Sequence, residues 1–359
     1  MIKIASLMAL LVSTQTIADD QVILPSRPAN AQHCLQELID QHGAHLKDDP
    51  YLELAIIEPN QVNRQSHAAG KCIETHRTRS VIILNKETLK SHGIEAKADH
   101  TYIANFRHQK SYFIAEIPNS GLIQRSLYQF EPFDPLTGEN GNGGEFPVQI
   151  GHGQTRFDFH QGKTVSLYDQ ILKTEEEQSP LHQIDGIVFS YYVADIIGNS
   201  QYDPKAGMAD QYGSVYVLMS REDAFKHYKS QNKPVEQTVL NFTEQEAHDA
   251  LSFYFQISND TQFKEYYNGY SRSCLTESLK GVAAGKGETF EMKAVNELEL
   301  LTQQEVAAHK TAEQANVQKK KRNLTYEYLK GIDAIRFYDE ATGSRGADAV
   351  TNFEQESLY

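Results

Sequence analysis

The chain lacks the short patterns that mark the commonest metal and nucleotide sites. Its 14 histidines are scattered along 359 residues, and no H-E-x-x-H, H-x-H or C-x-x-C sequence occurs. The glycine-rich stretch 134–144 has no G-K-S or G-K-T ending, and the acidic region 185–210 lacks the spacing of an EF-hand loop. We therefore expect neither a metal ion nor a cofactor.

Basic residues are fewer than acidic ones, and this limits the classes of partner. Lys and Arg number 34 and Asp and Glu number 48, which gives a formal net charge of -14. Nucleic acids and anionic membrane surfaces are bound through basic patches. We therefore expect neither as the main partner. The basic tract 319–322 is flanked by acidic residues, which favours an exposed helix face over a polyanion contact.

Long apolar runs are also missing. After the N-terminus no segment approaches the roughly 18 apolar residues of a membrane-spanning helix, so we expect no integral membrane protein. At the N-terminus, Lys3 precedes a short apolar run, 4–12, and Thr16–Ala18 has a small-x-small pattern. A core helix is the alternative, but this combination is typical of a secretory signal peptide. We predict cleavage near Ala18, a mature net charge of -15 and a periplasmic or secreted protein.

Cysteine is rare, and its odd count is informative. The chain has three cysteines, and an oxidising compartment would leave one of them unpaired. Cys34 and Cys72 both lie in the N-terminal part, so we predict a disulfide between them. Cys274 is then a free thiol. In an exported protein such a thiol is buried, reactive or paired with another molecule.

Cys274 stands where a tyrosine-rich, strand-like run, 266–273, gives way to a predicted helix. Ser273 is a typical N-cap, and apolar residues recur at helical spacing as far as Val282. The positive end of a helix dipole and its free N–H groups favour a thiolate. The sequence therefore presents Cys274 as a candidate nucleophile.

A cysteine nucleophile needs a base and a third group that orients the base. His152 lies at the start of a predicted strand, 148–159, which we expect to form a hairpin with strand 164–169. In that hairpin Asp169 lies diagonally across from His152 on the same face, within reach of the imidazole. We therefore predict His152 as the base and Asp169 as the orienting group, with a structural role as the alternative for His152.

The composition along the chain predicts an α+β protein in several parts. Residues 19–135 are expected to form a β-rich N-terminal module, followed by a linker rich in glycine and asparagine at 136–145. Residues 146–290 form the second domain, which carries both His152 and Cys274. Residues 291–359 are expected to form a C-terminal extension with a long charged helix.

Three motifs in the second domain occur in a recognisable order. Gly151-His152 comes first, then QTVLNFTEQE (237–246) with its helix cap, then FKEYYNGYSRSCLTESL (263–279). This order resembles the Lnb-type N-terminal periplasmic domain family of the permuted NlpC/P60 (papain-like) superfamily, over about residues 146–285. The family has Asn before its cysteine, where this chain has Ser273. The N-terminal module has no counterpart in the resemblance.

The resemblance implies a permuted papain-like domain and an exported thiol hydrolase or acyltransferase. Cys274 would attack a carbonyl carbon, His152 would act as base and then acid, and Asp169 would hold the imidazole. The implied substrates are amide or ester bonds in a cell-envelope peptide, glycan or lipid. The alternatives are a non-catalytic periplasmic binding or envelope-assembly protein on the same scaffold and, third, a metal-dependent enzyme.

Overall fold

The computed structural model describes residues 32–57, 69–132, 151–194, 196–198, 204–207, 210–231, 235–269, 271–290, 324–336 and 349–350. The predicted signal peptide, the linker and most of the predicted C-terminal helix lie outside these residues. Within the described ranges, no helix is both long enough and apolar enough to cross a membrane.

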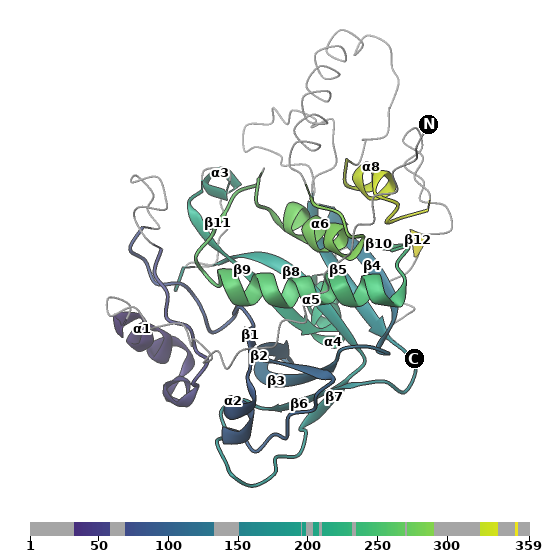
Figure 1. The fold of residues 1–359 in the computed structure, drawn as a ribbon. Helices are drawn as coiled ribbons and strands as arrows, with labels where there is room; N and C mark the ends of the chain where they lie inside the picture. The colour runs from purple at the N-terminus through teal and green to yellow at the C-terminus, as the bar shows by residue number, and fades with distance from the viewer. Residues whose placement is uncertain are drawn as a thin grey trace, which may run out of the picture.

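The structure is a mixed α+β fold built on one large sheet, which confirms the predicted class (Figure 1). The strands are β1 (Ile82–Ile83), β2 (His100–His108), β3 (Ser111–Pro118), β4 (Ile123–Pro132), β5 (Gly151–Phe159), β6 (Val165–Asp169), β7 (His182–Ile184), β8 (Gly186–Ala194), β9 (Tyr212–Ser220), β10 (Glu236–Val239), β11 (Tyr266–Tyr267) and β12 (Ala349–Val350). The helices are α1 (Gln32–His42), the 3-10 helix η2 (Ala44–Asp48), α2 (Lys86–Ser91), α3 (Pro204–Gly207), α4 (Arg221–Gln231), α5 (Glu244–Thr261), α6 (Cys274–Gly285) and α8 (Leu324–Gly331).

The strand order is β12-β10-β4-β5-β8-β9-β2-β3-β6-β7, with β1 beside β2 and β11 beside β9. The described pairs are antiparallel except for β2 and β9, which meet in parallel at Arg107 and Met219. Strand β4 precedes residues 136–145 and β5 follows them, yet these two strands are paired along their length. The two predicted modules therefore share one sheet.

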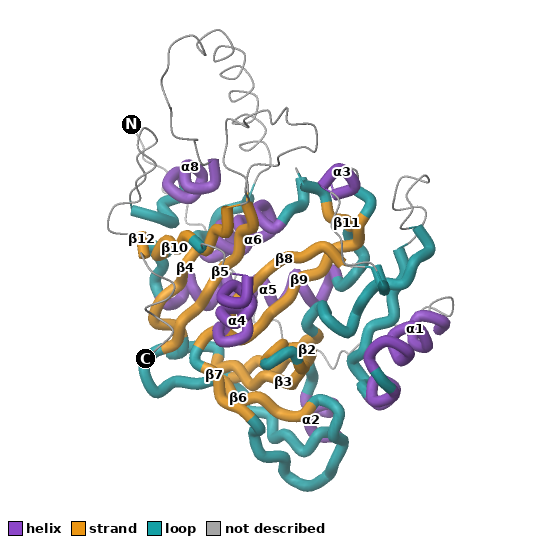
Figure 2. Tube along the Cα trace, turned by 180° about the vertical axis from the view of Figure 1, so that it is seen from behind, coloured by secondary structure: helices purple, strands orange, loops and turns teal. Residues whose placement is uncertain are grey.

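Helices cover both faces of this sheet. Helices α5 and α6 lie on one face in Figure 1, and Figure 2, seen from behind, shows α4 on the other. The α5 side chains Leu251 and Tyr254 pack with Phe189 of β8 in the largest apolar cluster. On the opposite face, Tyr228 of α4 packs against Val188 of β8. The central strands are consequently buried on both faces.

The predicted caps of α5 and α6 are confirmed. Thr243 Oγ1 accepts a hydrogen bond from the Glu246 N–H (3.2 Å), and the Glu246 carboxylate accepts one from the Thr243 N–H (2.6 Å). Ser273 is the N-cap of α6, and the Thr276 hydroxyl accepts from the Ser273 N–H at 2.7 Å. Each reciprocal pair satisfies two backbone donors at a helix start. Cys274 is therefore the first residue of α6.

The predicted hairpin between 148–159 and 164–169 is wrong. Strand β5 pairs with β4 and β8, whereas β6 pairs with β3 and β7. Four strands separate β5 from β6, which places them on the order of 20 Å apart along the sheet. The physical reason is that β5 is almost entirely buried and is satisfied by long partners on both sides. The hydrophobic pattern of β5 does not specify which strands these partners are.

The N-terminal segment is held together by a disulfide and a small apolar core. Cys34 of α1 is bonded to Cys72, with their Cα atoms 5.4 Å apart, so the predicted disulfide is confirmed. A separate apolar cluster surrounds the bridge. It consists of Cys34, Leu38, Leu46, Leu52, Leu54 and Cys72.

A buried polar network joins this segment to β2. Arg79 forms an ion pair with Asp49, and the side chains are 1 % and 5 % exposed. Asn105 lies where the β2–β3 register shifts, with a φ of 60°, and its N–H donates to Gln170 Oε1 at 3.0 Å. The Gln170 amide also donates to Asp49 Oδ1 (3.1 Å). The two buried charges are thus paired and hydrogen bonded on several sides.

Replacing Asp49 with Ala leaves the Arg79 guanidinium buried without its counter-ion. We expect Asp49→Ala to lower the free energy of unfolding by about 3–5 kcal/mol, the usual cost of removing one partner of a buried ion pair. Urea denaturation monitored by circular dichroism measures the change. The matched control is Asp48→Ala at the exposed neighbouring position, which should cost far less. Equal losses for the two variants would contradict the assigned role of the pair.

Candidate functional site

Cys274 lies against the backbone of β5. Its Sγ is 3.8 Å from the carbonyl oxygen of Gly151 and 3.8 Å from the Tyr267 hydroxyl, and the side chain is almost fully buried. The Gly153 backbone also hydrogen bonds to the thiol. The sulfur therefore contacts the strand on both sides of His152.

Close packing between α6 and β5 fixes this position. A Cβ at Gly153 would lie 2.2 Å from the Tyr128 hydroxyl and 2.8 Å from the Leu275 side chain, so a larger residue there is excluded. Ser278 Oγ donates to the Gly153 carbonyl at 2.9 Å. The missing side chain lets the first two turns of α6 approach the strand backbone directly. Cys274 reaches β5 for that reason.

Burial controls the protonation of Cys274. Desolvation raises the pKa of the thiol, and hydrogen bonds from Gly153 and Tyr267 offset the increase only in part. The backbone N–H groups of Cys274 and Leu275 at the helix start do favour the thiolate, as the sequence predicts, but burial outweighs them and the pKa of the thiol is raised overall. The helix-end effect is worth a fraction of a kcal/mol to about 2 kcal/mol, and transferring a thiolate out of water outweighs it here.

His152 leaves β5 on the opposite face. Its Nε2 is hydrogen bonded to Ser190 Oγ of β8 at 2.7 Å, and its ring stacks on Tyr192 with centroids 5.2 Å apart. Tyr192 belongs to the cluster beneath α4, whereas Gly153 faces α6. The structure thus brings Cys274 and His152 to one point of β5. The thiol approaches the backbone from the α6 face, and the imidazole lies on the α4 face.

Asp169 is not beside His152. Its carboxylate accepts hydrogen bonds from the N–H groups of Ile171 (2.7 Å) and Leu172 (3.2 Å), in the turn that follows β6. Its own N–H donates to Gln178 Oε1 at 2.7 Å. Because four strands lie between β5 and β6, the derivation that paired Asp169 with His152 fails.

The carboxylate that the fold does place near His152 belongs to Glu131. Glu131 is the cross-strand partner of His152 in the β4–β5 register, and it is buried. Directly opposed residues of an antiparallel pair share a face, with Cβ atoms about 4.5–5.5 Å apart. The Tyr192 ring stacks on His152, and burial, followed by Glu131 and Cys274, raises the pKa of Tyr192. A signal was present in the sequence, since β4 and β5 flank the glycine-rich stretch as a hairpin would.

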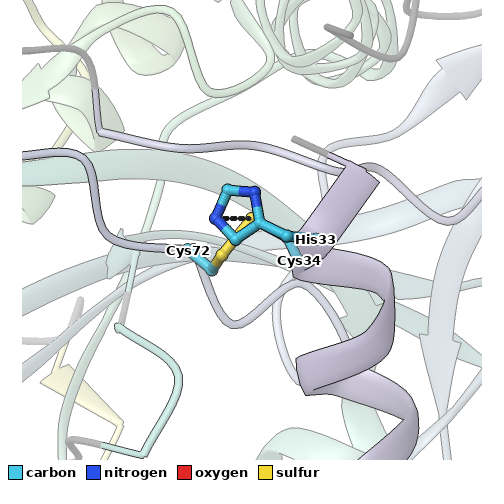
Figure 3. Close-up of side chains that lie close together, drawn as sticks. All are labelled: His33, Cys34 and Cys72. Atoms are coloured by element: carbon cyan, nitrogen blue, oxygen red, sulfur yellow. Dashed lines mark hydrogen bonds between the residues drawn. A yellow bond between two sulfur atoms is a disulfide. The ribbon is translucent and has the colours of Figure 1, made fainter. Parts of the chain in front are cut away.

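A compact group of metal-ligand residue types lies at the disulfide. His33, Cys34 and Cys72 have their ligand atoms within 4.8 Å of one another (Figure 3). The two sulfur atoms in this group are joined as the disulfide, so neither is available as a thiolate. The group is therefore no metal site while the bridge is intact.

No family model, curated protein or solved structure matches the chain. The resemblance drawn from the three motifs accordingly stays a prediction. Support for a function comes from the geometry around Cys274, His152 and Glu131.

The raised pKa of Cys274 makes alkylation a direct test of its environment. We expect iodoacetamide to react with Cys274 in the native protein more slowly than with N-acetylcysteine near neutral pH. The rate should keep rising as the pH is raised through the elevated pKa, because the thiolate is the reactive form. Intact-mass time courses at several pH values measure it. In urea the two thiols should react alike, and a native rate faster than that of the free thiol would contradict the burial argument.

Proposed function

We propose that the protein is an exported cysteine-dependent hydrolase or acyltransferase that acts on amide or ester bonds of cell-envelope components. Its scaffold is a permuted papain-like domain. The observation that carries the proposal is the contact of Cys274 Sγ, at the first residue of α6, with the Gly151 carbonyl of the strand that bears His152 (3.8 Å). The disulfide supports an oxidising compartment outside the cytoplasm.

The reaction proceeds through a thioester. His152 accepts the Cys274 proton, and the sulfur attacks the substrate carbonyl carbon to give a tetrahedral oxyanion. The bond from that carbon to the leaving oxygen or nitrogen then breaks, and the leaving group takes the proton from the imidazolium. Water, or an acceptor alcohol or amine, next attacks the thioester and gives its proton to His152. The acid or acylated acceptor is released, and the proton returns to the thiol.

Two further groups serve the histidine in this proposal. Ser190 holds Nε2 at 2.7 Å in the resting protein, and Glu131 lies across the β4–β5 register to stabilise the imidazolium. Backbone N–H groups at the start of α6 and at Gly153 are the donors for the oxyanion, since both already hydrogen bond to the sulfur.

Access to the thiol is part of the proposal. At 4 % exposure Cys274 cannot meet a carbonyl group in the resting conformation, so the proposal requires that the surroundings of the thiol open and that the His152 ring approaches the sulfur when substrate binds. Until then burial keeps the sulfur protonated. Movement that admits solvent and the imidazole lowers the desolvation penalty and restores the helix-end preference for thiolate.

Acyl transfer to Cys274 is testable with p-nitrophenyl acetate as the acyl donor. We expect the wild-type protein to gain one acetyl group at Cys274, detected by intact mass and peptide mapping, and hydroxylamine should remove it. Cys274→Ala should form no adduct. His152→Gln should slow acetylation by roughly 10²- to 10⁴-fold, the usual contribution of a positioned base.

The control variant is His160→Gln, an exposed histidine just beyond the same strand, which should react at the wild-type rate. Acetylation of His152→Gln at the wild-type rate would remove the imidazole from the mechanism. A wild-type protein whose Cys274 stays unmodified would contradict the enzyme proposal.

A second candidate is a non-catalytic binding or envelope-assembly protein on the same scaffold. The burial of Cys274 and its raised pKa favour this candidate, because a structural thiol has these properties. The two candidates differ in the cell. A strain that produces only Cys274→Ala should behave like the deletion strain if the protein is an enzyme, and like the parent strain if it is a binding protein.

A further inference from the structure

Four side chains with metal-ligand atoms gather at the end of α1, away from Cys274. His42 is the last residue of α1, and His45 follows in η2. Glu74 and His76 come from the turn after Cys72. In the sequence they form the pairs His-x-x-His and Glu-x-His, which are too far apart to be read as one motif.

The carboxylate of Glu74 is the centre of this cluster. His42 Nε2 lies 2.9 Å from Glu74 Oε2, and these side chains are 13 % and 5 % exposed. The other carboxylate oxygen, Oε1, accepts the backbone N–H of His76 at 3.1 Å. Two ligands of one tetrahedral zinc ion are about 3.3 Å apart, given bonds of about 2.0–2.1 Å. The His42–Glu74 pair is already close to that separation.

The remaining two imidazoles lie next to this pair. The ring of His76 is 4.2 Å from that of His42 between centroids, and the ring of His45 is 6.2 Å from His76. His76 Nδ1 is buried and has no hydrogen-bond partner. A buried nitrogen that forms no hydrogen bond loses its hydration without a compensating interaction, unless a ligand binds it. His45 is exposed.

The backbone holds the two halves of the cluster together. The Cys34–Cys72 disulfide ties α1 to the segment that leads into Glu74 and His76. Gly43 has a φ of 110°, a conformation that favours glycine, and it turns the chain between His42 and His45. Both pairs are therefore anchored before any ion arrives, which lowers the entropic cost of binding.

We propose that His42, His45, Glu74 and His76 bind a divalent transition-metal ion, with zinc as the probe. Nitrogen and carboxylate oxygen ligands suit Zn²⁺, and three histidines with one carboxylate complete a four-coordinate site. Binding needs rotation of the His45 and His76 rings, while His42 and Glu74 stay near their present positions. The site is independent of Cys274 and of the proposed thiol chemistry.

Zinc titration of the full chain without a polyhistidine tag tests the site. The protein is kept oxidised so that Cys34 and Cys72 remain bonded, and ZnCl₂ competes with a chromogenic chelator. We expect one equivalent to bind with a Kd of about 1 µM or tighter. The variant His45→Ala changes an exposed residue and should weaken binding by roughly 10- to 100-fold or more, since even the outer partners of zinc ligands contribute that much.

The control variant is His160→Ala, which removes another exposed histidine and should bind zinc as the wild type does. X-ray absorption of the zinc complex supplies a second readout. Nitrogen and oxygen ligands at about 2.0–2.1 Å are expected, and sulfur at about 2.3 Å would instead assign the ion to His33, Cys34 and Cys72 after reduction. Equal binding by His45→Ala and the wild type, or no binding by the wild type, would overturn the proposal.

Discussion

The direct contact between α6 and β5 is the constraint on which the candidate site depends. Gly153 has no side chain, and a Cβ there would lie 2.2 Å from the Tyr128 hydroxyl. Gly281, further along α6, lies so close to the Tyr254 ring of α5 that its Cβ would be 2.0 Å from it. The Tyr254 hydroxyl in turn donates to the Ser278 carbonyl at 2.6 Å. Two glycines and one tyrosine thus hold the two helices and the strand together, and this arrangement places the thiol of Cys274 against the β5 backbone at Gly151 and Gly153.

The same close packing has two opposing effects on the pKa of Cys274. A helix N-terminus and nearby donors favour a thiolate, while the dry interface raises the pKa of Cys274. Glu277, on the next turn of α6, experiences the same conflict. Burial raises the pKa of its carboxyl group, although it is hydrogen bonded to Tyr216 at 2.7 Å and Lys280 at 2.8 Å. Polar groups beneath α6 are therefore satisfied individually but kept from water. A site of this kind reacts only when solvent or substrate enters.

The N-terminal segment carries the proposed metal site, which depends on contacts other than those around α6. It has its own small core and a disulfide, and its Asp49–Arg79 ion pair is linked to Asn105 of β2. The histidine cluster at the end of α1 results from these anchors, since neither of its two residue pairs is a site alone. Metal binding there would stabilise the segment without any contact with α6. A negative result for the metal site would therefore leave the thiol-enzyme proposal unaffected, and the reverse also holds.

The sequence by itself determined the features that depend on near neighbours along the chain. Thr243 and Ser273 mark the starts of α5 and α6 because a cap is made within three residues, and the odd cysteine count identified Cys274 as the free thiol. The α+β class followed from local periodicity in the same way. Only the tertiary structure decided which strands are adjacent. It paired β5 with β4 and β8, brought Glu131 opposite His152 and left Asp169 on a strand separated from β5 by four others. Strand pairing and burial join residues distant in sequence, and a buried strand carries no local mark of its partner.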